Sequence, residues 1–401
     1  MAIPSIALIP TGTKAGTLYS VLPEDGSGDF TVVRATTATR VNENGLIESV
    51  ANNVPRLDYT DGGCPVLLTE PQSTNLVTYS EDFSNAAWIK TGVTAIAPVV
   101  TSNFIISPDG TQNADKIVFP IVSSGRSILY FPITTVVSSY SNSIYLKGEL
   151  GGEKVWLMNT KNGVDYFKVE CVLTTDWKSF SYSASLTAGG DNVQFGIDNR
   201  DASQTSTTIQ TVYVWGAQLE ALSYPTSYIP TTGSSVTRNA DQVTDSGDVN
   251  DFNSTEGVFM AEISALADDL TFRVISLSDG TSSNSIWLYY SADSNVIKIY
   301  DGTNALAYST DTTVNSKVAY VYDAVSTRLY INGFNVGSIA FKSFSGFNNL
   351  TFKDDAGTNP FYGKTKQLQV FKSALTSLEI ETLTSWESFI LMASAQQYTI
   401  Y

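Results

Sequence analysis

The chain has 401 residues, of which 42% are hydrophobic and 15% are charged. This composition excludes a disordered protein, and the length predicts two or three domains. The net charge of −16 argues against a nucleic-acid partner, because phosphate binding requires clustered lysine and arginine. Histidine is absent, which excludes Ser-His-Asp and Cys-His catalysis and His-ligated zinc.

The N-terminal stretch 1–16 is not predicted to be a signal peptide. It lacks a basic leading segment and is interrupted by Pro4 and Pro10. No apolar run approaches the ~20 residues of a membrane span, so we expect synthesis in the cytoplasm and no membrane insertion. Cys64 and Cys171 show no metal-ligand spacing and are expected to be reduced packing residues, with a disulfide between them as the alternative.

Residues 1–79 predict an irregular, extended β segment. Short apolar runs alternate with turns at 24–29 and 42–45, and Pro55, Pro65 and Pro71 interrupt the strands. Structural roles, solvated or in salt bridges, are expected for the three arginines of this segment: Arg34, Arg40 and Arg56.

Residues 80–243 predict a two-sheet antiparallel sandwich of jelly-roll type, because eight short strands are separated by turn residues. Phe83 and Trp88 are expected in its core. Three further tryptophans have two open interpretations, core packing or stacking on sugar rings: Trp156, Trp177 and Trp215. The polar, acidic stretch 244–257 predicts a linker.

Residues 258–401 predict a second antiparallel sandwich with one short helix. Asn332-Gly333 supplies the turn of a hairpin. Thr376 and Glu379 form a capping-box pattern at the helix start, and Leu375 and Ile380 occupy the positions of a hydrophobic staple. The apolar tail 389–401 is expected to be buried, either on its own domain or, as we favour, at a subunit interface.

Several motifs carry a resemblance to known families. WGAQLE (215–220), TSYIPT (226–231) and VTRNAD (236–241), together with residues 79–92, resemble carbohydrate-binding-module-like sandwiches of tailed-bacteriophage virion proteins. Residues 30–59 and 62–76 resemble a recurring block in phage fibre, tail and decoration proteins. The ending 367–383 resembles a concanavalin A or laminin G type sandwich.

The resemblance implies an all-β virion structural protein, a fibre, tail or head appendage displaying lectin-like sandwiches for adhesion to host-surface or environmental glycans. It implies other virion proteins as partners, a homotrimer, and assembly in a host cytoplasm. The alternative is a capsid decoration, neck or tail assembly protein that binds no glycan. A polysaccharide depolymerase is a third hypothesis.

The sequence does not predict an enzyme. A glycan-cleaving site needs two facing carboxylates about 5–10 Å apart. The adjacent acidic doublets would point to opposite faces of a strand: Glu81 with Asp82, Asp268 with Asp269, and Asp354 with Asp355.

Residues 286–290 offer the best candidate contact with a sugar. Strand alternation places Trp287 and Tyr289 on one face, leaving them as a platform if the other face enters the core; otherwise both rings fill the inter-sheet space. No cofactor is expected. Calcium is the ion that the laminin G resemblance would favour, but four turn aspartates lack the spacing of an autonomous calcium loop: Asp279, Asp293, Asp301 and Asp323.

Overall fold

The computed structural model describes residues 2–14, 16–93, 95–120, 126–161, 165–187, 190–198, 210–244, 246–387 and 391. Within these residues nearly all of the regular secondary structure is β-strand, with a single α-helix, which confirms the predicted all-β class. Two compact units are present. Unit 1 comprises Met1–Thr37, Val50–Pro71 and Ala240–Tyr401, whereas unit 2 comprises Ala38–Ser49 and Gln72–Asn239.

Each unit is built from two or three separate stretches of the chain. The prediction instead divided the chain into consecutive segments, with boundaries at residues 79, 243 and 257. Within unit 1, Ile6 and Leu8 are buried and pair with Leu368 to Val370 near the other end of the sequence. The stretch 244–257, predicted to be a linker, also lies in unit 1, and its Phe252 packs in the core. Apolar burial therefore draws N-terminal and mid-chain segments onto the C-terminal sandwich.

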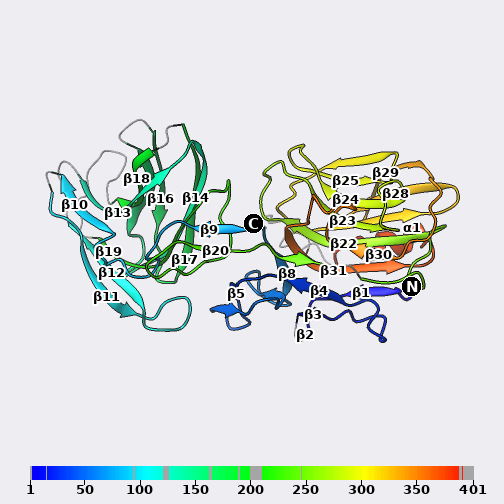
Figure 1. Ribbon diagram of the computed structural model, residues 1–401, viewed down its shortest axis with the longest axis horizontal. Helices are drawn as coiled ribbons and strands as arrows, with labels where there is room; N and C mark the ends of the chain where they lie inside the picture. Colours follow the sequence, from blue (N-terminus) through cyan, green and yellow to red (C-terminus); the bar gives the residue numbers. More distant parts are fainter. Residues whose placement is uncertain are drawn as a thin grey trace. The chain divides into compact units, whose positions relative to one another are not determined.

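Unit 1 contains two main antiparallel sheets (Figure 1). The larger has the order β29-β28-β27-β22-β31-β8-β7, with β1 also paired to β31. Its strands are β29 (Phe334–Ala340), β28 (Ser326–Ile331), β27 (Ser316–Tyr322), β22 (Gly257–Ala265), β31 (Gly363–Phe371), β8 (Val66–Thr69), β7 (Arg56–Asp58) and β1 (Ile6–Leu8).

The second sheet of unit 1 has the order β26-β25-β24-β23-β30. Its strands are β26 (Ala305–Ser309), β25 (Val296–Tyr300), β24 (Ser285–Tyr290), β23 (Arg273–Ser278) and β30 (Asn349–Thr351). A smaller sheet joins β2 (Thr13–Lys14), β3 (Thr17–Leu18), β4 (Phe30–Val33) and β21 (Gln242–Val243). One large apolar cluster draws residues from all three sheets, so these sheets share one continuous core.

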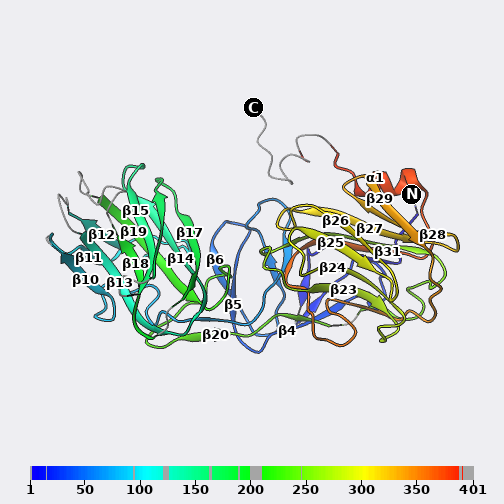
Figure 2. The same ribbon diagram turned by 90° about the horizontal axis from the view of Figure 1, so that it is seen from above.

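Helix α1 (Ser377–Thr384) packs on the opposite face of the larger sheet, over β27 and β28 (Figure 2). Thr376 accepts the amide of Glu379, and the Glu379 carboxylate accepts the amide of Thr376, which confirms the predicted capping box. Leu375 and Ile380 share one buried cluster, as the staple requires. Asn332 and Gly333 both have positive φ, which confirms the predicted hairpin turn.

Unit 2 is a sandwich of two five-stranded antiparallel sheets, as predicted. One has the order β10-β13-β18-β15-β16, from β10 (Ile89–Val93), β13 (Arg126–Thr135), β18 (Gly190–Asp198), β15 (Lys154–Lys161) and β16 (Asp165–Val172). The other has the order β11-β12-β19-β14-β17, from β11 (Val99–Ile105), β12 (Ala114–Phe119), β19 (Gln210–Glu220), β14 (Ser138–Gly148) and β17 (Lys178–Leu186). Phe83 and Trp88 lie in the core between the sheets, as expected.

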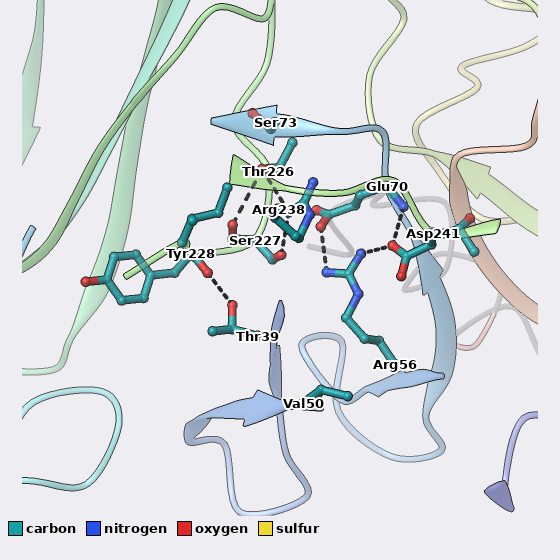
Figure 3. Close-up of polar contacts among 12 residues, drawn as sticks. Thr39, Val50, Arg56, Glu70, Ser73, Thr226, Ser227, Tyr228, Arg238 and Asp241 are labelled. Carbon is teal, nitrogen blue, oxygen red and sulfur yellow. Dashed lines mark hydrogen bonds and ion pairs between the residues drawn. The ribbon is translucent and has the colours of Figure 1, made fainter. Parts of the chain in front are cut away.

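The hairpin of β5 (Ala38–Val41) and β6 (Ile47–Val50) contributes to a second apolar cluster of unit 2. Ile47 packs there with Trp215 and Tyr228, and Thr39 donates a hydrogen bond to the carbonyl of Tyr228 at 2.5 Å (Figure 3). Trp215 is therefore a core residue, and Trp177 packs partly buried beside it. Strand β20 (Val236–Arg238) pairs with β9 (Ser73–Asn75) in the same unit.

A buried ion network holds unit 1 together. Arg56 binds the carboxylates of Glu70, at 2.6 Å, and of Asp241 (Figure 3). Arg34 binds the other oxygen of Asp241 at 2.8 Å. All four side chains are almost completely buried. The expectation of structural arginines is confirmed, and it also holds for Arg40, which pairs with Glu48 in unit 2.

Both cysteines are free thiols; Cys171 is buried, whereas Cys64 is exposed and not a packing residue. No helix within the described ranges is long and apolar enough to cross a membrane. The predicted burial of the tail 389–401 lies outside the described residues, apart from position 391.

Candidate functional site

Strand β24 has one face in the core of unit 1 and one face outside it. Ile286, Leu288 and Tyr290 belong to the large apolar cluster and are almost fully buried. Because successive strand residues point to opposite faces, Trp287 and Tyr289 lie on the outward face. The alternation on which the predicted platform depends is therefore present.

The cross-strand register places Trp287 in the middle of a row that crosses the sheet. Trp287 pairs with Tyr300 on β25 and with Ser276 on β23, and Tyr300 pairs in turn with Ala305 on β26. The rings of Trp287 and Tyr300 are 5.3 Å apart and inclined at 58°. Both side chains are partly exposed, so two adjacent rings stand on the open side of the sheet.

The strands on the two sides of this row differ in how far their outward faces are covered. On β26 the outward side chains are small and exposed: Ala305, Ala307 and Ser309. On β23 the outward side is covered, because Ser276 is buried and donates a hydrogen bond to the carbonyl of Lys353 at 2.8 Å. The Trp287 and Tyr300 rings are thus flanked by the small side chains of β26 on one side. On the other side they are flanked by the turn that covers β23.

Tyr289 occupies the next row along β24. The ring of Phe272 stacks on it with 5.9 Å between centroids and an interplanar angle of 9°. Phe272 is 44% exposed, whereas Tyr289 is only 9% exposed. Burial raises the pKa of Tyr289. Phe272 therefore presents the open ring surface at this position, and Tyr289 supports it from below.

We call Phe272, Trp287, Tyr289 and Tyr300 the aromatic face. The structure brings the two predicted residues together, with 6.3 Å between the rings of Trp287 and Tyr289. Trp287 remains partly open and Tyr289 is covered. That these two side chains contact a sugar stays a prediction.

Polar groups flank the aromatic face. The indole Nε1–H of Trp287 donates to Asp355 Oδ2 at 3.0 Å. Within the described part of the chain, Asp355 Oδ1 is shielded from solvent and accepts no hydrogen bond. Lys298 on β25 lies opposite Tyr289 on the neighbouring strand β24. Its ammonium forms an ion pair with Asp293. The hydrogen bond and charge of Lys298 lower the pKa of the exposed Asp293 carboxyl.

In each acidic doublet considered for catalysis, one carboxylate binds groups in its own neighbourhood of the chain. Asp354 accepts the amides of Thr358, at 2.6 Å, and Asn359, at 3.0 Å. Asp269 pairs with the buried Arg273 at 2.7 Å. Asp82 accepts the hydroxyl of Ser84 at 2.7 Å. These bonds give one member of each doublet a local structural role.

Three of the four turn aspartates considered for calcium accept backbone amides of their own turns, and the fourth, Asp293, pairs with Lys298. Asp279 accepts the amide of Thr281, and Asp301 accepts those of Thr303 and Asn304. Asp323 accepts the amides of Val325 and Ser326. Among the described residues no group of three acidic or cysteine side chains is placed to hold a metal ion. Calcium binding stays a prediction.

Three members of the site were not predicted. Tyr300 was detectable, because Lys298 and Tyr300 alternate with the buried Ile297 and Ile299 on β25. Phe272 precedes β23 and gave no such signal. Asp355 lies 68 positions from Trp287, so the sequence could not indicate that the two side chains meet.

Comparison with known proteins concerns unit 1 most directly. Residues 238–381 match the profile of the concanavalin A-like lectin/glucanases superfamily, over less than half of the chain. The search of curated proteins found no match.

Solved structures with similarity include the CBM40 of Ruminococcus gnavus IT-sialidase bound to alpha2,3 sialyllactose, with 14% identity and a TM-score of 0.30, covering 36% of this chain and 95% of that chain. Domain 4 of AbnA, a GH43 extracellular arabinanase from Geobacillus stearothermophilus, has 15% identity and a TM-score of 0.32, covering 36% and 73%. A SAP-like pentraxin from Limulus polyphemus has 15% identity and a TM-score of 0.28, covering 34% and 72%. The C-terminal part of unit 1 therefore combines antiparallel sandwich sheets with similarity to concanavalin A-like domains.

Proposed function

We propose that this protein binds glycans, and that the aromatic face of unit 1 is the binding surface. One observation carries the proposal: Trp287 and Tyr300 form a partly exposed ring pair on the outward face of a sandwich sheet, beside the exposed alanines of β26. The match of residues 238–381 to a superfamily described by its lectins and glucanases supports it.

The chemistry of the surface suits a sugar ring. A pyranose has an apolar C–H face, which stacks on aromatic side chains, and a rim of hydroxyl groups, which needs polar partners. Trp287 and Tyr300 supply the stacking surface, and Asp355 and Lys298 lie at its edge. A shallow surface of this kind gives weak single-site binding, which many copies on one particle would multiply.

We further propose that the protein is a non-enzymatic bacteriophage virion component, a fibre, tail or head appendage assembled as a homotrimer with other virion proteins. This part of the proposal rests on the motifs at 30–59, 62–76, 79–92 and 215–241. Antibody labelling of intact particles in electron microscopy would locate the protein, and its absence from purified particles would refute this role.

A purely structural role in virion assembly is the second candidate. The burial of Trp88 and Trp215 favours it for unit 2, because these rings pack inside the unit and leave no stacking surface of their own. Under this hypothesis the aromatic face of unit 1 contacts another virion protein, and no glycan binds.

A glycan array with the full chain, followed by calorimetry on the best ligand, tests glycan binding. Trp287→Ala removes the larger ring and should weaken binding at least about tenfold, a loss typical of a stacked aromatic. Phe334→Ala is the matched control, because Phe334 is 71% exposed on another sheet of unit 1 and should be silent. Equal affinity of both variants and the wild type for the ligand would refute the site. In a separate assay, release of reducing ends when the protein is incubated with host capsule would show that it is a depolymerase.

A further inference from the structure

We infer that the aromatic face selects neutral sugars over sugars that carry a carboxylate, and that Asp355 makes this selection. The inference rests on the proposed glycan binding and adds the chemical class of the ligand. It follows from the charges beside the rings and from the hydrogen-bonding state of one carboxylate.

Asp355 is held at the edge of the Trp287 ring. Its Oδ2 accepts the indole Nε1–H at 3.0 Å, which fixes the carboxylate next to the surface on which a sugar would stack. In the part of the chain that the structure describes, no lysine or arginine forms an ion pair with Asp355. A sugar stacked on Trp287 therefore meets an uncompensated negative charge.

The cation beside the rings is already neutralised. Lys298 lies opposite Tyr289 on the neighbouring strand. Its ammonium forms an ion pair with Asp293. The three charged groups Asp355, Asp293 and Lys298 sum to −1, on a chain whose net charge is −16. A sugar carboxylate stacked beside Asp355 would be repelled, and Lys298 is already engaged with Asp293.

The second oxygen of Asp355 favours a hydroxyl. Oδ1 accepts no hydrogen bond among the described residues and is shielded from water. A sugar hydroxyl can donate to this carboxylate, which keeps unused lone pairs beside the indole, forming a charge-assisted bond. A sugar carboxylate is ionised at neutral pH and has no proton to donate.

The test uses oligosaccharides of glucose, galactose and mannose, each paired with the uronate in which the C6 alcohol is oxidised to a carboxylate. Calorimetry on the full chain should show that the best neutral ligand binds at least about tenfold more tightly than its uronate. Raising the salt from about 20 mM to about 500 mM should reduce this ratio, because the repulsion is screened.

Asp355→Asn keeps a carbonyl oxygen for the indole and removes the charge. It should weaken binding of the neutral ligand several-fold and reduce the preference over the uronate to about threefold or less. Glu24→Gln makes the same chemical change at an exposed position of unit 1 and should alter neither value. The salt series needs no variant and so tests the inference even if Asp355→Asn fails to fold.

The results separate the inference from the proposed function. Uronates that bind as tightly as the neutral ligands, with both lost in Trp287→Ala, would overturn the inference and leave glycan binding intact. A preference that persists unchanged in Asp355→Asn, or at high salt, would also overturn it. The absence of any glycan binding would overturn both.

Discussion

Arg34 Nη1 donates to Asp241 Oδ1 at 2.8 Å, although the two residues are 207 positions apart in the sequence. The other oxygen of Asp241 binds Arg56 and accepts the amide of Glu70. One carboxylate therefore joins three separate stretches of unit 1, each of which contributes strands to its sheets. The chain must reach residue 241 before this network can close.

Asp241→Ala should destabilise unit 1 by about 3–5 kcal/mol, because it leaves two buried guanidinium groups without this carboxylate. Chemical denaturation followed by tryptophan fluorescence would measure the loss. Asp61→Ala is the control, since Asp61 forms an exposed ion pair with Lys364 and its loss should cost less than about 1 kcal/mol. Equal losses would contradict a structural role for the buried network.

Asp115 should make the stability of unit 2 depend on pH. Burial raises its pKa to about 6, against the amide hydrogen bonds of Asn103 and Phe83, which lower it. Because the folded pKa exceeds the unfolded one, the stabilising contribution is complete below about pH 4 and is lost as the pH rises through 6. A shift of about two pKa units corresponds to roughly 3 kcal/mol.

Denaturation of the wild type and of Asp115→Asn between pH 4 and 7 would measure this effect. The amide cannot titrate, so the stability of the variant relative to the wild type should increase by up to about 3 kcal/mol across this range. Parallel pH profiles for the two proteins would show that Asp115 does not carry the dependence.

The sequence predicted what depends on neighbouring residues. The alternation of Ile286, Trp287 and Leu288, the Asn332-Gly333 turn and the capping box at Thr376 all follow from local spacing, and the structure contains each of them. These features were predictable because a strand or a turn imposes its own period on a few consecutive residues.

Long-range pairings were not predictable in the same way. Ile6 has the character of a strand residue, but nothing in its neighbourhood specifies Val370 as its partner. Asp355 belongs to an acidic turn, and only the return of that turn over β23 brings it to Trp287. The site was therefore predicted as two rings, without the carboxylate beside them.

Phe272→Ala should lower the pKa of Tyr289 towards its ordinary value. Phe272 covers the Tyr289 ring, and burial is the main cause of the raised pKa. Titration of the tyrosine signals by NMR would follow the change. Phe272→Leu retains an apolar cover and should give a smaller shift; a Tyr289 pKa unchanged in both variants would show that another group buries the hydroxyl.

Thr376→Ala should weaken helix α1 by about 1 kcal/mol, because it removes the hydroxyl that caps the amide of Glu379. Faster hydrogen exchange of the α1 amides would report the loss. Thr382→Ala is the control on the same helix: Thr382 is exposed, and alanine has the higher helix propensity. Exchange that increases equally in both variants would contradict a specific capping effect.

Asn142 and Asn159 are buried polar residues of unit 2. Asn142 Nδ2 lies 3.5 Å from the carbonyl of Met158, and its Oδ1 has no partner in the described chain. Asn159 is 1% exposed, and neither polar atom of its amide has a hydrogen-bond partner among the described residues. A buried amide that forms no hydrogen bond costs about 1–3 kcal/mol.

Asn159→Leu should therefore stabilise unit 2 by about 1–3 kcal/mol, because leucine has a similar volume and needs no hydrogen bond. Asn75→Leu is the matched comparison. Asn75 donates to the carbonyls of Ala217 and Ile229 and accepts the amides of Val77 and Leu219, so its replacement should destabilise by a similar amount or more. Urea denaturation would measure both changes. A loss of stability in Asn159→Leu would mean that the Asn159 amide binds water inside the sandwich, which the leucine displaces.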